Sequence, residues 1–395
     1  MRLRYNGFNL KIYNIQRNLL FFDMDILADQ YLYKLNEFLP KACSLTLYDP
    51  EEGFPEDASQ FDALLVRTVT AINKRTLPDT GRLQFIGSAT AGTDHIDRDY
   101  LEECGIEFAN SAGCNSQAVA EYVITTLYRW AEDFGVNPKK LRVGVVGCGH
   151  AGSALIRLLE KLNIETVMYD PPKEERDLGF QSASLKNLFD CDVLSFHTPL
   201  THTGPHATWH LCSKLWLENE FQLIINTARG GVVDEAALLN AMAEGKVKGS
   251  ILDVWEGEPV FSDEMAQKAV IATPHIAGYS RQAKWRASEL VINKLCTFFG
   301  LNPQKNKMSE QVDESSLVIK EGMTFAKFMW ENNIIDFYDR ELLKLIGIQD
   351  KHKAEKFSKL RSETETRFEY RSIIKVAENK AALPELSDIF KNRKV

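Results

Sequence analysis

Short apolar runs alternate with segments of helical spacing along most of this chain. The runs have the length and the bounding turn residues of buried β-strands. The segments 28–39, 115–134 and 281–299 instead repeat apolar residues on one face of a helix. Strands alternating with helices predict parallel sheets that are covered by helices on both faces. The predicted strands are 18–23, 44–49, 63–68, 83–88, 143–146, 166–170, 192–197, 221–227, 249–255 and 269–273.

This alternation predicts two doubly wound parallel-sheet domains. Residues 1–108 are expected to form a flavodoxin-like domain, which a helix over 281–300 completes. Residues 109–280 carry enough strand and helix units for a complete Rossmann domain. The polar segment 301–316 is predicted to be a linker. The first two domains therefore place the chain in the α/β class.

The pattern changes after the linker. The segment 325–347 has helical spacing and many aromatic residues, whereas 367–376 has the pattern of a strand. Residues 317–395 are therefore predicted to form a small α+β C-terminal domain.

Composition narrows the class of protein. At 395 residues the chain exceeds the size of a single core, which agrees with several domains. A net charge of -8 argues against nucleic acid as the main partner, since phosphate backbones attract basic surfaces. The seven cysteines form no CxxC pair and no metal-ligand spacing, so we expect no metal and a cytoplasmic location. No apolar run is long enough to predict a membrane span, and the basic N-terminus does not predict a signal peptide.

A glycine-rich turn carries the clearest cofactor signal. In "GVVGCGHAG" (144–152), Gly147, Gly149 and Gly152 have the G-x-G-x-x-G spacing between a predicted strand and a helix. Free N–H groups at the start of that helix favour a pyrophosphate. Asp170 ends the next strand, where a carboxylate binds the ribose hydroxyls of NAD and repels the extra phosphate of NADP. The motif, with His150 and Ala151 before its last glycine, predicts an NAD site.

Three polar residues have the chemistry of an alcohol dehydrogenase. His275, in "TPHIAGYS" (273–280), can take the hydroxyl proton because its ordinary pKa lies near neutral pH. Glu258 can orient the imidazole and stabilise its charged form. Arg229 can hold a substrate carboxylate by two parallel hydrogen bonds. All three follow predicted strands of the Rossmann domain, where open α/β sheets form their sites.

These motifs resemble the D-isomer-specific 2-hydroxyacid dehydrogenase superfamily. Within it, "ATAGTDHID" (89–97), "AGCNSQAVAEYV" (112–123) and "HIAGYSRQAKWRAS" (275–288) are similar to the erythronate-4-phosphate dehydrogenases. "FSKLRSETETRFEYRSIIKV" (357–376) resembles the C-terminal dimerisation domain of that family. The resemblance implies a substrate domain, an NAD domain and a homodimer. It also implies oxidation of 4-phospho-D-erythronate to (R)-3-hydroxy-2-oxo-4-phosphooxybutanoate in pyridoxal 5'-phosphate (vitamin B6) biosynthesis.

The resemblance assigns roles to further residues. The catalytic set falls on Arg229, Glu258 and His275, and the substrate contacts fall on Thr68, Thr90 and Tyr279. Thr68 departs from the family, which usually has serine there. Besides the glycine motif and Asp170, the NAD contacts fall on Thr198, Ala228, Arg229, Asp253 and Gly278.

Some alternatives stay open at this point. Another acid dehydrogenase, such as a 3-phosphoglycerate dehydrogenase, would use the same three residues, and a non-catalytic NAD sensor would use only the cofactor site. Arg67, Lys284 and Arg286 are candidates for binding the substrate phosphate. The C-terminal aromatics favour either a homodimer interface or a small core; they are Phe325, Phe328, Trp330, Phe337 and Tyr338.

Overall fold

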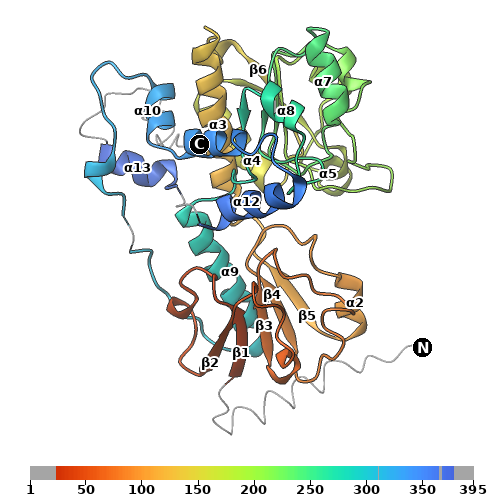
Figure 1. The fold of residues 1–395 in the computed structure, drawn as a ribbon, viewed down its shortest axis with the longest axis vertical. Helices are drawn as coiled ribbons and strands as arrows, with labels where there is room; N and C mark the ends of the chain where they lie inside the picture. The colour runs from red at the N-terminus through yellow and green to blue at the C-terminus, as the bar shows by residue number, and fades with distance from the viewer. Residues whose placement is uncertain (1–23, 310, 364–366, 378–395) are drawn as a thin grey trace. The chain divides into compact units, whose positions relative to one another are not determined.

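The computed structural model describes residues 24–309, 311–363 and 367–377 (Figure 1). Contacts divide the chain into two compact units. Among the described residues, the first combines 24–115 with 282–309, and the second combines 116–281 with 311–363 and 367–377. The predicted boundaries of three domains, and a C-terminal domain of its own, stay predictions.

The first unit contains a five-stranded parallel sheet. Its order, β2-β1-β3-β4-β5, is the flavodoxin-like order. Apolar side chains on both faces of β3 and β4 are buried, as expected for a parallel sheet that is covered on two sides. The strands are β1 (Met24–Asp29), β2 (Cys43–Tyr48), β3 (Ala63–Val66), β4 (Phe85–Ser88) and β5 (Glu107–Asn110).

The helix α9 (Arg281–Phe299) matches the predicted helix over 281–299 and covers one face of this sheet (Figure 1). A Cβ at Gly87 of β4 would come within 2.5 Å of Val291 Cγ2, so this close approach requires glycine. The other face carries α2 (Arg98–Glu103), whose N-cap Asp97 accepts a hydrogen bond from the Tyr100 N–H.

The start of the chain carries two predicted elements, a strand over 18–23 and a helix over 28–39. The strand predicted over 18–23 lies outside the described residues. The helix predicted over 28–39 is wrong, since β1 extends to Asp29 and only a 3-10 turn, η1 (Leu35–Glu37), follows. Lys34 has a φ of 49°, which a right-handed helix does not allow. Pairing of β1 with both β2 and β3 outweighs the local helical spacing.

The second unit contains a six-stranded parallel sheet in the order β11-β10-β9-β8-β6-β7. Neighbouring side chains of one strand enter opposite cores: Val145 packs under α3 and α4, and Val146 packs with α6 to α8. The strands are β6 (Arg142–Val146), β7 (Glu165–Tyr169), β8 (Val193–Phe196), β9 (Leu223–Asn226), β10 (Ser250–Leu252) and β11 (Ile271–Ala272). The helices are α3 (Ser116–Asp133), α4 (His150–Lys161), α5 (Pro171–Arg176), α6 (Leu185–Phe189), α7 (Glu235–Ala243) and α8 (Asp263–Lys268).

The C-terminal segment contributes four helices to the second unit: α10 (Phe325–Glu331), α11 (Ile335–Leu343), α12 (Asp350–Glu363) and α13 (Tyr370–Ala377). Phe325 packs edge-on against Tyr128 of α3, with ring centroids 4.8 Å apart. The Asp339 carboxylate accepts the Ala272 N–H of the edge strand β11 at 2.7 Å. Phe325, Phe328 and Tyr338 are buried in this packing, so they act as core and do not form an exposed dimer surface.

The strand predicted over 367–376 is wrong, because α13 occupies most of it. Tyr370, Ile373 and Ile374 are all buried and have helical spacing. Their β-branched and aromatic side chains favour a strand when only the local sequence is considered. The described residues of 317–377 contain helices but no strand, so the β part of the predicted α+β domain has no counterpart there.

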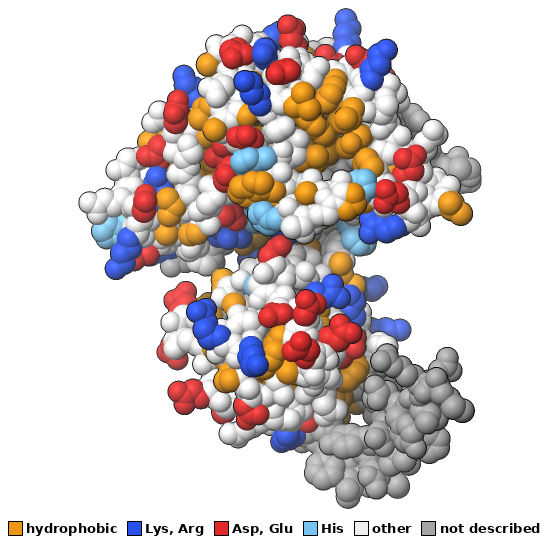
Figure 2. Space-filling model, turned by 90° about the vertical axis from the view of Figure 1, so that its right-hand side faces the viewer, with side chains coloured by type: hydrophobic (Ala, Val, Ile, Leu, Met, Phe, Trp, Pro, Cys, Tyr) orange, Lys and Arg blue, Asp and Glu red, His pale blue; other side chains and the backbone are white. Residues whose placement is uncertain are grey.

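Short 3-10 turns complete the elements: η2 (Ala58–Gln60), η3 (Pro138–Lys140), η4 (Trp216–Glu218) and η5 (Glu314–Ser316). Acidic and basic side chains are interspersed over the face drawn in Figure 2, without a large block of one sign. Within the described part of the chain, every helix is too short or too polar to span a membrane.

Candidate active site

His275 and Glu258 form a hydrogen-bonded pair in the second unit. His275 lies three residues after β11, and its Nδ1 is 2.5 Å from Glu258 Oε1. Each side chain keeps about a quarter of its surface exposed, at 26% and 25%. A substrate could therefore approach the imidazole while the carboxylate holds its other side.

The electrostatics of the pair favour an ionised Glu258. Burial is the largest single influence and raises the pKa of this carboxyl, but the nearby His275 and its ring hydrogen bond lower it. The Arg361 guanidinium and the Trp255 N–H, which is 3.3 Å from Oε2, act in the same direction. The pKa of Glu258 is consequently below its ordinary value. An ionised carboxylate only accepts hydrogen bonds, so Nδ1 donates and Nε2 is left to accept a proton.

Asp253 fixes the loop that carries His275. Its carboxylate accepts hydrogen bonds from Thr273 Oγ1 at 2.6 Å, Ile276 N at 2.7 Å and Ala277 N at 2.8 Å. These contacts hold His275 at a φ of 56°, an uncommon backbone conformation for a residue other than glycine. Asp253 was predicted to contact NAD. The structure gives it a direct role in the shape of the loop of His275, which sequence reasoning missed.

The loop of Glu258 has a second support that the sequence did not reveal. The buried Glu235 carboxylate accepts the Glu256 N–H at 2.6 Å, two residues before Glu258. Burial raises the pKa of Glu235 to about 7, with Glu256 and Glu258 adding to the effect. Glu235 lies at the start of α7, next to the N-cap Asp234, and nothing in the neighbouring sequence indicates that it supports the loop of Glu258. The Glu256 N–H that it accepts lies 21 residues further along the chain.

Arg229 lies in a turn after β9 that Asn226 shapes. Asn226 Oδ1 accepts the Ala228 N–H at 3.1 Å, and its Nδ2 donates to the Arg229 carbonyl at 3.1 Å. Gly230 is needed because a Cβ there would lie 1.8 Å from the Trp255 carbonyl oxygen. That close approach brings the turn of Arg229 against the backbone that leads to Glu258. Arg229 Nη1 donates to the Ala228 carbonyl at 2.8 Å, which orients the guanidinium.

The glycine motif has the expected strand–turn–helix context. Gly147, with a φ of 88°, turns directly after β6, and a Cβ at this position would meet the Thr198 N at 2.9 Å. A Cβ at Gly152 would lie 1.9 Å from the Gly147 carbonyl oxygen, so close packing of the helix also requires glycine. A Cβ at Gly149 would meet no atom within 4 Å, which leaves the N-terminus of α4 open to a ligand. His150 and Ala151 form the first turn of that helix.

Asp170 connects β7 to the glycine turn. Its Oδ2 accepts the Cys148 N–H at 2.7 Å, and its Oδ1 accepts the Lys173 N–H at 2.9 Å as the N-cap of α5. Each carboxylate oxygen can accept a further hydrogen bond, such as one from a ribose hydroxyl. Lys173 Nζ donates to the Cys148 carbonyl at 3.0 Å, so this cation is engaged inside the turn.

Buried polar atoms near this turn fit a bound dinucleotide. Thr198 Oγ1 is buried without a hydrogen-bond partner, and such a group is costly unless a ligand satisfies it. The preceding His197 was missed by sequence reasoning. Its ring contacts Ser195 Oγ at 2.8 Å and Thr227 Oγ1 at 3.2 Å, and burial lowers its pKa to about 3. A neutral His197 thus braces the segment that carries Thr198.

The remaining predicted site residues lie in turns. Thr68 and Thr90 belong to the first unit and follow the paired strands β3 and β4 by two residues. Thr90 Oγ1 is 2.7 Å from Ser88 Oγ, whereas Thr68 is exposed. Gly278 and Tyr279 lie in the turn after His275, and Arg361 Nη2 donates to Tyr279 OH at 3.1 Å.

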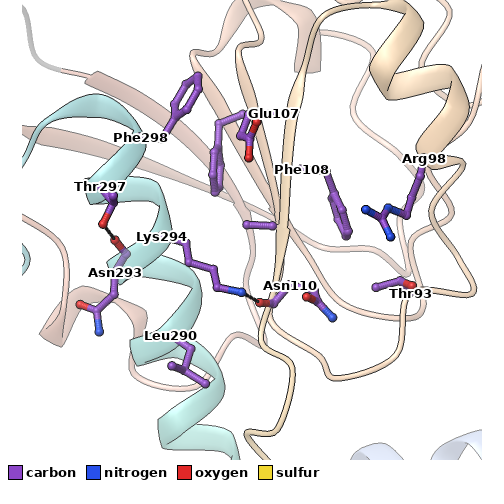
Figure 3. A pocket seen from close by; sticks show the side chains of 12 residues that line it. Thr93, Arg98, Glu107, Phe108, Asn110, Leu290, Asn293, Lys294, Thr297 and Phe298 are labelled. Atoms are coloured by element: carbon purple, nitrogen blue, oxygen red, sulfur yellow. Dashed lines mark hydrogen bonds between the residues drawn. The ribbon is translucent and has the colours of Figure 1, made fainter. Parts of the chain in front are cut away.

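A pocket of about 710 Å³ lies elsewhere, between the edge strand β5 and α9 of the first unit (Figure 3). Lys294 crosses it and donates to the Asn110 carbonyl at 2.6 Å, and Arg98 lies over the Phe108 ring. None of the predicted catalytic, substrate or NAD residues lines this pocket. Its mixed charges and open edge give no chemical reason to assign the reaction to it.

Comparison with known proteins places these features in a family. The NAD binding domain of the D-isomer specific 2-hydroxyacid dehydrogenases matches residues 118–277. The chain is 38% identical to the erythronate-4-phosphate dehydrogenase of Marinobacter nauticus over 299 residues, 74% of this chain and 77% of that protein. It is 34% identical to the enzyme of the same name from Baumannia cicadellinicola, over 89% of this chain and 94% of that protein.

Solved structures share the fold. D-lactate dehydrogenase from Aquifex aeolicus, complexed with NAD and lactic acid, has a TM-score of 0.57 at 24% identity and covers 70% of this chain and 95% of its own. NAD-dependent formate dehydrogenase from Staphylococcus aureus, in complex with NAD, has a TM-score of 0.55 at 21% identity over 70% of this chain and 96% of its own.

Proposed function

The chain belongs to the erythronate-4-phosphate dehydrogenase family of D-isomer specific 2-hydroxyacid dehydrogenases, and we propose that it catalyses that family's reaction. It oxidises 4-phospho-D-erythronate to (R)-3-hydroxy-2-oxo-4-phosphooxybutanoate, with NAD as hydride acceptor, in vitamin B6 biosynthesis. The observation that carries the proposal is the His275–Glu258 pair in the same unit as Arg229 and an open glycine turn.

NAD fits the second unit. The N-terminus of α4 and the turn of Gly147 to Gly152 would hold the pyrophosphate, and Asp170 would accept the ribose hydroxyls. Thr198, Ala228, Asp253 and Gly278 complete the proposed cofactor contacts. When bound, the nicotinamide accepts a hydride from the carbon that bears the substrate hydroxyl.

His275 is the proposed general base. Since Glu258 accepts the hydrogen bond from Nδ1, Nε2 takes the proton of the substrate hydroxyl as the hydride leaves. Glu258 stabilises the resulting imidazolium and keeps the ring in this tautomer.

Arg229 is proposed to bind the substrate carboxylate next to the reacting carbon. Its Nη1 is oriented by the Ala228 carbonyl, and the rest of the fork presents the paired donors that a carboxylate matches. Thr68, Thr90 and Tyr279 are proposed to contact the rest of the substrate through their hydroxyl groups.

The protein is proposed to be a cytoplasmic homodimer. All seven cysteines are free thiols, which suits a reducing compartment. The dimer rests on the resemblance of 357–376 to a dimerisation domain, and a molar mass from light scattering tests it.

Turnover tests the reaction. NADH formation would be followed by absorbance with 4-phospho-D-erythronate, 3-phosphoglycerate and D-erythronate as substrates. We expect a clear preference for 4-phospho-D-erythronate. A preference for 3-phosphoglycerate would keep the chemistry and overturn the substrate.

His275→Ala tests the base. We expect its kcat to fall by roughly 100- to 10,000-fold, the range for loss of a general base. NAD affinity, measured by calorimetry, should stay unchanged. A variant that retains full activity would exclude His275 from the chemistry.

A further inference from the structure

The C-terminal segment brings a cation to a predicted substrate residue. Arg361 of α12 lies 82 residues beyond Tyr279, and its Nη2 donates to Tyr279 OH at 3.1 Å. Its guanidinium carbon is also 5.7 Å from the centre of the Tyr279 ring. Two separate contacts therefore attach this arginine to the turn that follows His275.

The charge of Arg361 is not neutralised by an ion pair. Among the described residues, no carboxylate oxygen lies within salt-bridge distance of its guanidinium, and Nε is buried without a hydrogen-bond partner. Burial lowers the pKa of Arg361, but Tyr279, Glu258 and Asp253 raise it by more, so the cation persists. Buried guanidinium groups are costly unless they bind an anion.

The substrate has more negative charge than Arg229 can hold. A phosphate monoester adds about 1.5 to 2 negative charges at neutral pH, in addition to the carboxylate. Two of the three residues that the sequence suggested for binding the substrate phosphate already donate a guanidinium hydrogen bond to another group of the protein. Arg67 Nε donates to the buried Asp29 at 2.8 Å, and Arg286 Nε donates to the Cys114 carbonyl at 2.8 Å.

We propose that Arg361 and Tyr279 bind the phosphoryl group of the substrate and so set the preference for a phosphorylated hydroxy acid. This inference rests on the proposed function. The planar fork of an arginine matches phosphate oxygens by parallel hydrogen bonds, and the tyrosine hydroxyl, held by Nη2, donates its own proton to a third oxygen. Arg361 then acts as a specificity-determining residue from a segment outside the Rossmann sheet.

The test compares two substrates that differ only in the phosphate. Arg361→Gln should lower kcat/KM for 4-phospho-D-erythronate by roughly 10- to 150-fold, as expected for hydrogen bonds to a charged group. The loss for D-erythronate should be clearly smaller, since only the effects of Arg361 on Tyr279 and Glu258 remain when the phosphate is absent. Arg361→Lys keeps the charge without the fork, so we expect an intermediate loss.

Arg340→Gln is the matched control, because Arg340 lies on the same segment, is exposed and pairs only with Asp336. It should leave both substrates unchanged. Equal losses for both substrates in the Arg361 variants would overturn the proposal and make Arg361 a support for Tyr279 and Glu258.

Calorimetry on the NADH complex provides a readout independent of turnover. Wild-type protein should bind 4-phospho-D-erythronate more tightly than Arg361→Gln does, and the difference between the two proteins should be clearly smaller for D-erythronate. If wild-type protein neither binds nor oxidises 4-phospho-D-erythronate, the proposed function itself fails. If it does both and the variant matches it, only the role of Arg361 fails.

Discussion

Two glutamates of the second unit lie near basic side chains, but their pKa values shift in opposite directions. Glu258 contacts His275 at 2.5 Å, and its pKa is lowered despite burial. Glu121 of α3 lies 3.8 Å from Arg367, yet its pKa is raised to about 8, first by burial and then by the neighbouring Glu369. A nearby opposite charge alone therefore does not decide the state of a carboxyl group.

The two glutamates differ in their exposure to solvent and in whether a second acidic side chain lies nearby. Glu258 keeps part of its surface exposed and lies near His275 and Arg361, whereas Glu121 is fully buried and has the acidic Glu369 as well as Arg367 as charged neighbours. Arg367 also donates to the carbonyls of Ala118 and Ala277, so its charge is divided among several acceptors. The first arrangement suits proton transfer, and the second attaches the C-terminal segment to α3.

Removing the charge of Glu258 should have the largest effect on activity. Glu258→Gln cannot stabilise an imidazolium, so we expect kcat to fall by roughly 100- to 10,000-fold, as for the acid of a catalytic triad. Steady-state NADH formation measures the loss. Glu256→Gln, two residues earlier and bonded to His210, is the control and should retain most activity. Comparable losses in both variants would mean that the loop, and not the charge, matters.

Removing Arg367 should have the largest effect on stability. Arg367→Met removes the two hydrogen bonds from a buried guanidinium to the carbonyls of Ala118 and Ala277. Since a hydrogen bond to a charged group contributes about 1.5–3 kcal/mol, we expect the free energy of unfolding to fall by about 3–5 kcal/mol. Urea denaturation followed by circular dichroism measures this. Arg142→Met removes the exposed pair with Glu165 and a long, exposed hydrogen bond of 3.5 Å to the Asn187 carbonyl, so it should cost about 1 kcal/mol. If Arg367→Met lowered the free energy of unfolding by a similarly small amount, the buried contacts of Arg367 would not be important for stability.

Glu121→Gln should have the smallest effect at neutral pH but the clearest pH signature. A carboxyl whose folded pKa is raised binds its proton more tightly when folded, so its contribution to stability falls as pH rises from about 4.3 to the folded pKa near 8. The Gln variant lacks this proton. Wild-type stability should therefore decline relative to the variant between about pH 5 and pH 8.

Glu258→Gln should show the opposite sign. A lowered folded pKa gives stability that is present above the unfolded pKa and lost as pH falls through the folded value. Urea midpoints at several pH values measure both variants. Parallel curves for wild type and Glu121→Gln would contradict a proton on Glu121.

Much of the site follows from sequence because its parts are local. Gly147 and Gly152 are required by a tight turn and a close approach, and Arg229, Glu258 and His275 each follow a strand end within a few residues. These rules depend on near neighbours in the chain, so they predicted the glycine turn and two parallel sheets correctly.

Sequence reasoning failed where distant contacts outweigh local pattern. The helix expected over 28–39 does not form: β1 takes its first two residues, which pair with neighbouring strands, and turns with a single 3-10 turn follow. Residues 370–377 form α13 because one face of that helix packs on the core, although β-branched residues favour strands when taken alone.

The sequence by itself determined the glycine turn and the family and was sufficient to propose the reacting groups, since these depend on residue types at short spacings. The tertiary structure decided how those groups are tuned. Asp253 fixes the unusual backbone of His275, Glu235 supports the loop of Glu258, and Arg361 reaches Tyr279 from α12. Charge and hydrogen bonding act through space, and residues far apart in the chain meet only after folding.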